Sequence, residues 1–237
     1  MKEYLRSKVK AARKRRALWV RALDLVRLVR SAEGRGQLWT RAAHADALHQ
    51  STPDTWEERY PELFDLAANL LPDAKRILSF GCSSGEELVS LRRRFPEAQI
   101  VGVELNPRSR RIAARRTAAD RRTSVHSRIP DGAFDIIFAL AVLQREPHKI
   151  AEMQVDDLSP YYPFEKFDGA VRRLVRRLRA GGLLCVQHSH YRIENSSAAA
   201  ELVPIASSPA LRGLLFGRNG RRLEAATGRT LFRKRSA

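Results

Sequence analysis

A turn bounded by two glycines and followed by two acids is the most informative stretch of this chain. Gly81 and Gly85 enclose Cys-Ser-Ser, after the apolar run 76–80 and directly before Glu86 and Glu87. Turns that bind a diphosphate direct the N–H groups of the following helix at the anion. Carboxylates at that helix start suit the helix dipole but would repel a diphosphate. The turn therefore favours a cationic or zwitterionic ligand.

A further acid lies at the end of the next apolar run. Glu104 follows Gly85 by about 20 residues, the separation at which an acid accepts hydrogen bonds from ribose hydroxyls. Together with the turn, Glu104 indicates a nucleoside ligand that lacks a diphosphate. S-adenosylmethionine fits best, because it combines a ribose and adenine with a sulfonium cation and an amino-acid end. We expect Glu86 or Glu87 to lie near that amino-acid end.

Side chains that could handle an acceptor follow the later strands. The candidates for catalysis are His188, His190 and Tyr191, and those for substrate binding are Gln144, Tyr161, Tyr162 and Phe164. A histidine titrates near neutrality and could act as a base, or it could be a hydrogen-bonding histidine at a strand end. Tyr161 and Tyr162 could form an aromatic wall for the substrate or a lid that packs on the core. Two histidines without nearby cysteines or a carboxylate pair predict no metal site.

The elements that position these residues alternate along the chain. Apolar runs predict strands at 76–80, 98–105, 123–127, 134–143 and 183–189, and amphipathic segments predict helices at 85–95, 107–121 and 163–182, the last stopped by two glycines. Such alternation predicts an α/β fold: a Rossmann-like, mostly parallel seven-stranded sheet. Asn219-Gly220 and the run 229–234 predict a C-terminal antiparallel hairpin on this sheet.

The N-terminal part differs in composition from the rest. Residues 8–30 predict a basic amphipathic helix, 31–37 a turn-rich break, and 53–71 further helix. We therefore expect an N-terminal helical extension over 1–72 and the ligand-binding domain over 73–237.

The net charge of +18 is concentrated at the two ends. Residues 1–30 hold eleven Lys and Arg against two acids, and residues 212–237 hold eight against one, so the middle is nearly neutral. This distribution leaves contact with RNA or an anionic surface possible through the ends. No apolar run approaches the ~20 residues of a membrane span, and Cys82 and Cys185 make no disulfide framework. A cytoplasmic location is expected.

Four segments together resemble a known family. "ILSFGCSSGEE", "VGVELN", "FDIIFALAVLQ" and "LRAGGLLCVQHSHYR" are similar to successive motifs of the class I S-adenosylmethionine-dependent methyltransferases, including bacterial methyltransferase-like proteins, over roughly 76–192. The resemblance implies that the cofactor lies against Gly81, Cys82, Ser83, Gly85, Glu86, Glu104, Leu105, Asn106, Ser127 and Ala139. Within this set, Glu104 would hold the ribose and Leu105 and Asn106 would flank the adenine.

The resemblance also implies an activity. We expect methyl transfer by in-line displacement from S-adenosylmethionine to an undetermined, small-molecule acceptor. Two alternatives stay open: an RNA-directed methyltransferase that uses the basic ends, and a non-catalytic binding module that retains the fold.

Overall fold

The computed structural model describes residues 30–43, 48–50, 55–206, 214–224 and 229–236. The chain divides into two compact units, Met1–Ala45 and Asp46–Ala237. In the second unit, α3 (Pro61–Leu70) is grouped with the sheet. The extent of an N-terminal extension ending at residue 72 stays a prediction. The expected basic helix at 8–30 lies outside the described residues, apart from Arg30.

In the described part of the first unit, the segment where the sequence predicted a break is helical. The helix α2 (Ala32–Ala43) includes both glycines of the segment 31–37, so the predicted break is wrong. Its first turn is closed by Ser31, whose hydroxyl accepts a hydrogen bond from the backbone N–H of Gly34 at 2.9 Å. A serine in this position satisfies a helix N–H that has no partner within the helix, which favours helix initiation despite the glycines.

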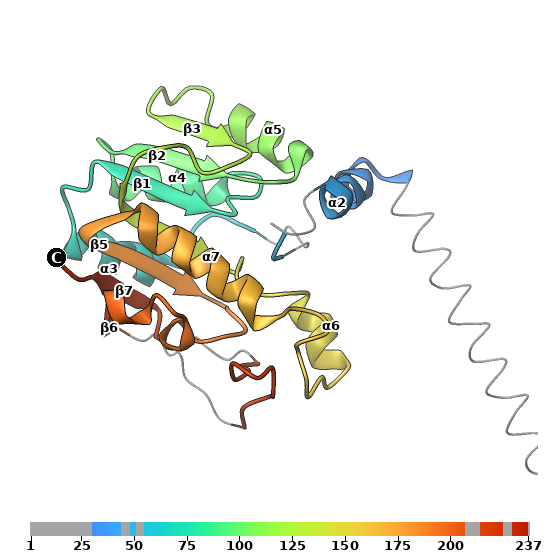
Figure 1. The fold of residues 1–237 in the computed structure, drawn as a ribbon. Coiled ribbons are helices and arrows are strands. Elements are labelled where there is room, and N and C mark those ends of the chain that lie inside the picture. Colours follow the sequence, from blue (N-terminus) through green and yellow to red (C-terminus); the bar gives the residue numbers. More distant parts are fainter. Residues whose placement is uncertain (1–29, 44–47, 51–54, 207–213, 225–228, 237) are drawn as a thin grey trace, which may run out of the picture. The chain divides into compact units, whose positions relative to one another are not determined.

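The second unit is built on a seven-stranded sheet with the order β3-β2-β1-β4-β5-β7-β6 (Figure 1). The first five strands in this order run parallel, and β7 pairs antiparallel with both β5 and β6, which confirms the predicted α/β fold. The strands are β1 (Arg76–Phe80), β2 (Gln99–Val103), β3 (Thr123–His126), β4 (Phe134–Leu140), β5 (Leu178–Gln187), β6 (Leu202–Ala206) and β7 (Leu231–Lys234).

Helices cover both faces of this sheet. The remaining helices are α4 (Glu86–Arg94), α5 (Pro107–Arg116), α6 (Pro147–Glu152), α7 (Phe164–Arg177) and two short 3-10 helices, Ile193–Asn195 and Ala199–Glu201. Neighbouring strand residues point to opposite faces: Leu78 joins the core under α7, whereas Ile77 joins the core under α3 and α4. Figure 1 shows α7 crossing in front of the sheet. The near-continuous apolar strands follow from this double coverage.

The boundary between α7 and β5 differs from the prediction. The helix ends at Arg177, and the strand begins at once with Leu178, so Gly181 and Gly182 lie within β5 instead of stopping the helix. The pairing of β4 with β5 shifts register at this point. A Cβ on Gly182 would lie 2.7 Å from the carbonyl oxygen of Asp135, so the glycine permits close approach of the two strands.

The C-terminal antiparallel pair forms, but not around Asn219-Gly220. It consists of β7 and of β6, a strand that the sequence did not predict. The Asn219-Gly220 segment makes a tight turn of its own, in which the N–H of Gly217 donates to the carbonyl of Arg221 at 2.8 Å. This turn packs beside the loop before α7, because the N–H of Leu158 donates to the carbonyl of Gly220 at 2.9 Å. Within the described ranges, no helix combines the length and apolar character that membrane crossing requires.

Candidate active site

The candidate site lies at the carboxyl ends of β1, β2 and β4. The chain runs outward from β1 to β3 and returns to place β4 on the other side of β1, which makes this edge the topological switch point. A pocket of about 50 Å³ opens here. Its walls are Leu48, His49, Gln50, Phe80, Gly81, Val103, Glu104, Leu105 and Val142.

The glycine turn is fixed to the neighbouring strand. The N–H groups of Gly81 and Cys82 both donate to the carbonyl of Val103, at 2.9 and 3.0 Å. Gly81 has φ +86°, and a Cβ there would lie 2.7 Å from Cγ2 of Val142. A side chain at this position would therefore force the β4 loop away from the pocket.

Gly85 permits close packing between two helices. A Cβ on Gly85 would lie 2.9 Å from Cα of Ala113 in α5. The glycine also has φ +93°, in the left-handed region that disfavours other residues. Gly85 thus allows the start of α4 to pack closely on α5, and a cofactor contact for it stays a prediction.

Glu104 is held rigidly at the pocket wall. Its Oε2 accepts a hydrogen bond from the N–H of Ser83 at 3.0 Å, and its Oε1 accepts one from the N–H of Asn106 at 2.7 Å. Burial raises the pKa of the carboxyl, and these N–H donors oppose that rise. A carboxylate has about four lone-pair sites, so both oxygens can still accept from vicinal hydroxyls.

The two acids after the turn have different surroundings. Glu86 accepts hydrogen bonds from the hydroxyl of Ser84 and pairs with Arg116 at 2.8 Å. Burial raises the pKa of the Glu87 carboxyl to about 7, against the opposing effects of the Ser79 hydroxyl and Arg59. Glu86 is therefore already paired with an arginine, and a contact of either acid with a ligand ammonium group stays a prediction.

The side chains of several predicted cofactor residues do not line the pocket. Cys82 is buried in the core, where its Sγ lies 2.8 Å from where a Cβ on Gly102 would be. Burial raises the pKa of the Cys82 thiol, which keeps it protonated. Asn106 caps α5, because its Oδ1 accepts from the N–H of Arg108 at 2.9 Å.

Two others lie away from the walls of the pocket. Ala139 is buried within β4, and Ser127 is exposed beyond β3. A cofactor contact for either stays a prediction. Leu105, in contrast, lines the pocket as expected.

Two of the residues expected to catalyse, His190 and Tyr191, are buried and hydrogen-bonded to backbone carbonyl groups. His190 is buried, with Nε2 3.0 Å from the carbonyl of Arg145 and Nδ1 3.3 Å from that of Leu214. Tyr191 is fully buried and donates its hydroxyl to the carbonyl of Tyr162 at 2.6 Å. Both side chains therefore have hydrogen-bond partners within the protein, as the alternative for His190 expects, and a catalytic role for either stays a prediction.

His188 lies at the end of β5, outside the pocket walls. Its ring packs against the ring of Tyr60 with 5.7 Å between centroids and an angle of 47° between the ring planes. Burial lowers the pKa of His188. Its φ of +51° places it in the left-handed region, a strained conformation for a non-glycine residue. A catalytic role for His188 stays a prediction.

The predicted substrate residues fall into two groups. The side-chain amide of Gln144 donates a hydrogen bond to the carbonyl of Ala141 at 3.1 Å. Phe164 packs edge-on against Tyr191, and Tyr161 is exposed. These three side chains lie outside the walls of the pocket. Tyr162 is different, because its hydroxyl lies 2.6 Å from Nδ1 of His49, a residue of the pocket wall.

His49 is the residue that sequence reasoning missed. It is buried beside the glycine turn, although it lies far from every motif along the chain. Burial lowers the pKa of its imidazole to about 3, and the charges of Lys166, Arg173 and Arg145 add to that effect. A lone histidine outside any recognisable pattern gave no signal, since only the tertiary structure brings it to Tyr162.

A family model described as a methyltransferase domain matches residues 55–208 of this chain. Curated relatives include the trans-aconitate 2-methyltransferases of Rhodopseudomonas palustris, 30% identical over 134 residues, and Methylobacterium nodulans, 34% identical over 134 residues. In both cases the match covers 55% of this chain and 45% of the relative. The chain therefore matches less than half the length of these relatives.

Solved structures support the fold. The N-methyltransferase NodS from Bradyrhizobium japonicum is similar with a TM-score of 0.50 and 16% identity, over 76% of this chain and 96% of that one. TehB from Haemophilus influenzae is similar with a TM-score of 0.51 and 12% identity, over 74% of this chain and 62% of that one. At these identities the similarity concerns the fold alone.

Proposed function

Because the chain belongs to the methyltransferase domain family, we propose that it is an S-adenosylmethionine-dependent methyltransferase that methylates a small anionic acceptor. The observation that carries the proposal is the Glu104 carboxylate, oriented by the N–H groups of Ser83 and Asn106 at the wall of the switch-point pocket. A buried acid fixed in this way is suited to the two hydroxyls of a ribose.

The other residues of the pocket fit the cofactor. Phe80, Val103, Leu105 and Val142 offer apolar walls for a nucleoside. The hydroxyl of Ser83 is buried and has no hydrogen-bond partner within the described parts of the chain, which leaves it available to a ligand. Glu87 would lie towards the ammonium group of the amino-acid end, because Glu86 is paired with Arg116.

S-adenosylmethionine supplies an electrophilic methyl group, whose bond to sulfur breaks with the electron pair left on sulfur as a bond to the acceptor forms. The protein has to align the acceptor and exclude water. A general base is needed only when the acceptor atom carries a proton. An acceptor that is already deprotonated would need no base from His188 or His190.

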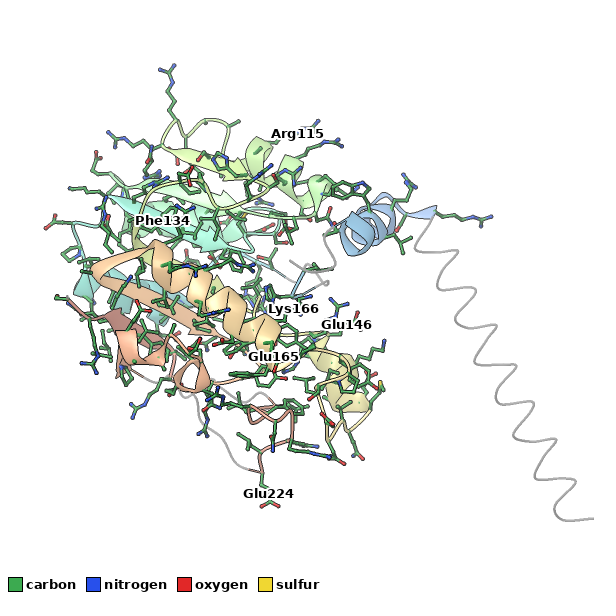
Figure 2. The ribbon with its side chains drawn as sticks, in the orientation of Figure 1. Arg115, Phe134, Glu146, Glu165, Lys166 and Glu224 are labelled. Atoms are coloured by element: carbon green, nitrogen blue, oxygen red, sulfur yellow. The ribbon has the colours of Figure 1, made fainter. Side chains whose placement is uncertain are left out.

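Positive charge near the pocket favours an anionic acceptor. Arg145 donates to the carbonyl of His49 at 3.4 Å, and Arg145, Lys166 and Arg173 all lie close enough to His49 to lower its pKa. Figure 2 places Lys166 at the start of α7. The curated relatives are named for trans-aconitate, a carboxylate. A carboxylate oxygen would attack the methyl group without loss of a proton.

A methylation assay tests this proposal. Purified protein is incubated with S-adenosylmethionine carrying a labelled methyl group and a panel of carboxylates that includes trans-aconitate, and the products are identified by mass spectrometry. We expect labelled methyl ester and an equal amount of S-adenosylhomocysteine. Cofactor binding without turnover of any carboxylate would contradict the proposed acceptor.

The RNA-directed alternative depends on segments outside this site. Residues 1–29 lie outside the described residues, as do parts of 212–237, so contact with RNA through the basic ends stays a prediction. Its test is RNA binding that weakens with salt and is lost when residues 1–30 are deleted. A cytoplasmic location also stays a prediction.

A further inference from the structure

His49 combines three properties that the proposed mechanism does not yet use. It forms part of the wall of the same pocket as Gly81 and Glu104. Its Nδ1 lies 2.6 Å from the hydroxyl of Tyr162. Its Nε2 is buried and has no hydrogen-bond partner within the described ranges of the chain. A buried polar atom without a partner is unfavourable, so a ligand in the pocket is the natural partner for it.

The place of His49 in the fold identifies which ligand that would be. Phe80 lies edge-on to the imidazole at the end of β1, with 6.3 Å between ring centroids. Val142, another wall residue, belongs to the loop after β4. Glu104, which suits the ribose, lines the same pocket from the end of β2. His49 therefore lines the pocket together with the end of β1 and the β4 loop, and the Arg145 cation that donates to its carbonyl suits an anionic acceptor at this place.

The surroundings of His49 define the form of its ring. Burial and the nearby cations keep the imidazole neutral at physiological pH, so it carries a single N–H. Burial also raises the pKa of the Tyr162 phenol, which stays protonated and can donate to Nδ1. In that arrangement the proton of the imidazole is on Nε2, and the free ring nitrogen is a hydrogen-bond donor, not a base.

We propose that His49 is an acceptor-binding residue whose Nε2–H donates a hydrogen bond to a carboxylate of the acceptor, and that Tyr162 is the positioning residue that holds the imidazole in this tautomer. The proposal rests on the proposed function, because it requires an acceptor beside the cofactor. The donor would bind the carboxylate oxygen that does not attack, and Arg145, which reaches the backbone of His49, would add positive charge.

A set of variants separates the two ring nitrogens. The amide nitrogen of Gln can reach the place of Nε2, whereas the shorter Asn reaches only the place of Nδ1. We therefore compare His49→Gln, His49→Asn and Tyr162→Phe with the control His148→Asn, which changes an exposed histidine of α6. Calorimetry measures the Kd of S-adenosylhomocysteine, and then the Kd of trans-aconitate, malonate and succinate as probes with S-adenosylhomocysteine saturating.

We expect at least one probe to bind the wild type. His49→Asn should raise the Kd of that probe at least tenfold. His49→Gln should recover most of that loss, and Tyr162→Phe should weaken the probe by several fold. The Kd of S-adenosylhomocysteine should stay within about twofold of the wild type in every variant. Failure of S-adenosylhomocysteine to bind the wild type would instead contradict the proposed function.

Two results would overturn the assignment while leaving the proposed function intact. The first is a probe Kd unchanged by His49→Asn. The second is an equal loss of S-adenosylhomocysteine affinity, which would place His49 in the cofactor site. No binding of any carboxylate probe would overturn the assignment and contradict the proposed anionic acceptor as well. Nitrogen NMR of the folded protein gives a readout independent of affinity: we expect a neutral Nε2–H tautomer from pH 5 to 8. An imidazole that gains a proton in this range would also overturn the assignment.

Discussion

The carboxylate of Glu104 accepts a hydrogen bond from the backbone N–H of Ser83 at 3.0 Å, which ties the end of β2 to the turn after β1. Its second oxygen accepts from the N–H of Asn106. Glu104→Gln is therefore not a conservative change, since the amide would place an NH₂ group against one of two N–H donors. We expect a stability loss of about 1–2 kcal/mol, measured by urea unfolding. The exposed change Glu97→Gln should have little effect, and an equal loss in both variants would contradict this role of Glu104.

Two glycines should respond in opposite directions to alanine. Gly85→Ala places a Cβ 2.9 Å from the backbone of Ala113 in a left-handed conformation, and we expect a loss of about 1–3 kcal/mol. Gly169 lies within α7, and a Cβ there meets no atom within 4 Å. Gly169→Ala should therefore stabilise by about 0.5–1 kcal/mol through helix propensity. Equal effects in urea unfolding would show that Gly85 does not mediate the packing of α4 on α5.

Glu87 predicts a specific pH dependence of stability. Burial raises its pKa from 4.5 to about 7 in the folded protein, so the folded state retains the proton more strongly than the unfolded state. The stability that this provides is complete below about pH 4.5 and is lost as the pH rises through about 7. Glu87→Gln stays neutral throughout. It should match the wild type in Tm near pH 4 and exceed it at pH 8, whereas the exposed Glu62→Gln should show no such divergence.

Positive charge at the acceptor side should affect affinity for an anion. Arg145→Met removes a cation that reaches the backbone of His49. We expect a carboxylate probe to bind about tenfold more weakly, a difference of about 1.4 kcal/mol. Arg177→Met is the matched control, because Arg177 pairs with Asp131 at the far end of α7. Equal probe affinity in the two variants would argue against an anionic acceptor.

The glycine turn and the acid that the sequence assigned to the cofactor lie together in the structure, because local patterns determine both. The turn after β1 requires positive φ at Gly81, and the acid after β2 follows at a recognisable spacing. Parallel strands then bring both to one edge of the sheet, where the N–H of Ser83 meets Glu104.

The acceptor side could not be read in the same way. His49 and Tyr162 meet through tertiary packing alone, because they are 113 positions apart in the chain. His190 looked available for catalysis, but carbonyl groups from two loops surround its ring.

The boundary between α7 and β5 was also misplaced. Gly181-Gly182 resembles a helix stop, but the two glycines lie in β5 where its pairing with β4 is irregular.

Calorimetric titration of S-adenosylmethionine into the wild type, Glu104→Ala and the control Glu97→Ala is the decisive test of the cofactor site. We expect saturable one-site binding to the wild type and the control. Binding should be at least tenfold weaker for Glu104→Ala, because the ribose hydroxyls lose their acceptor. No binding to the wild type, or the same Kd for all three proteins, would contradict the assignment of Glu104 to the ribose.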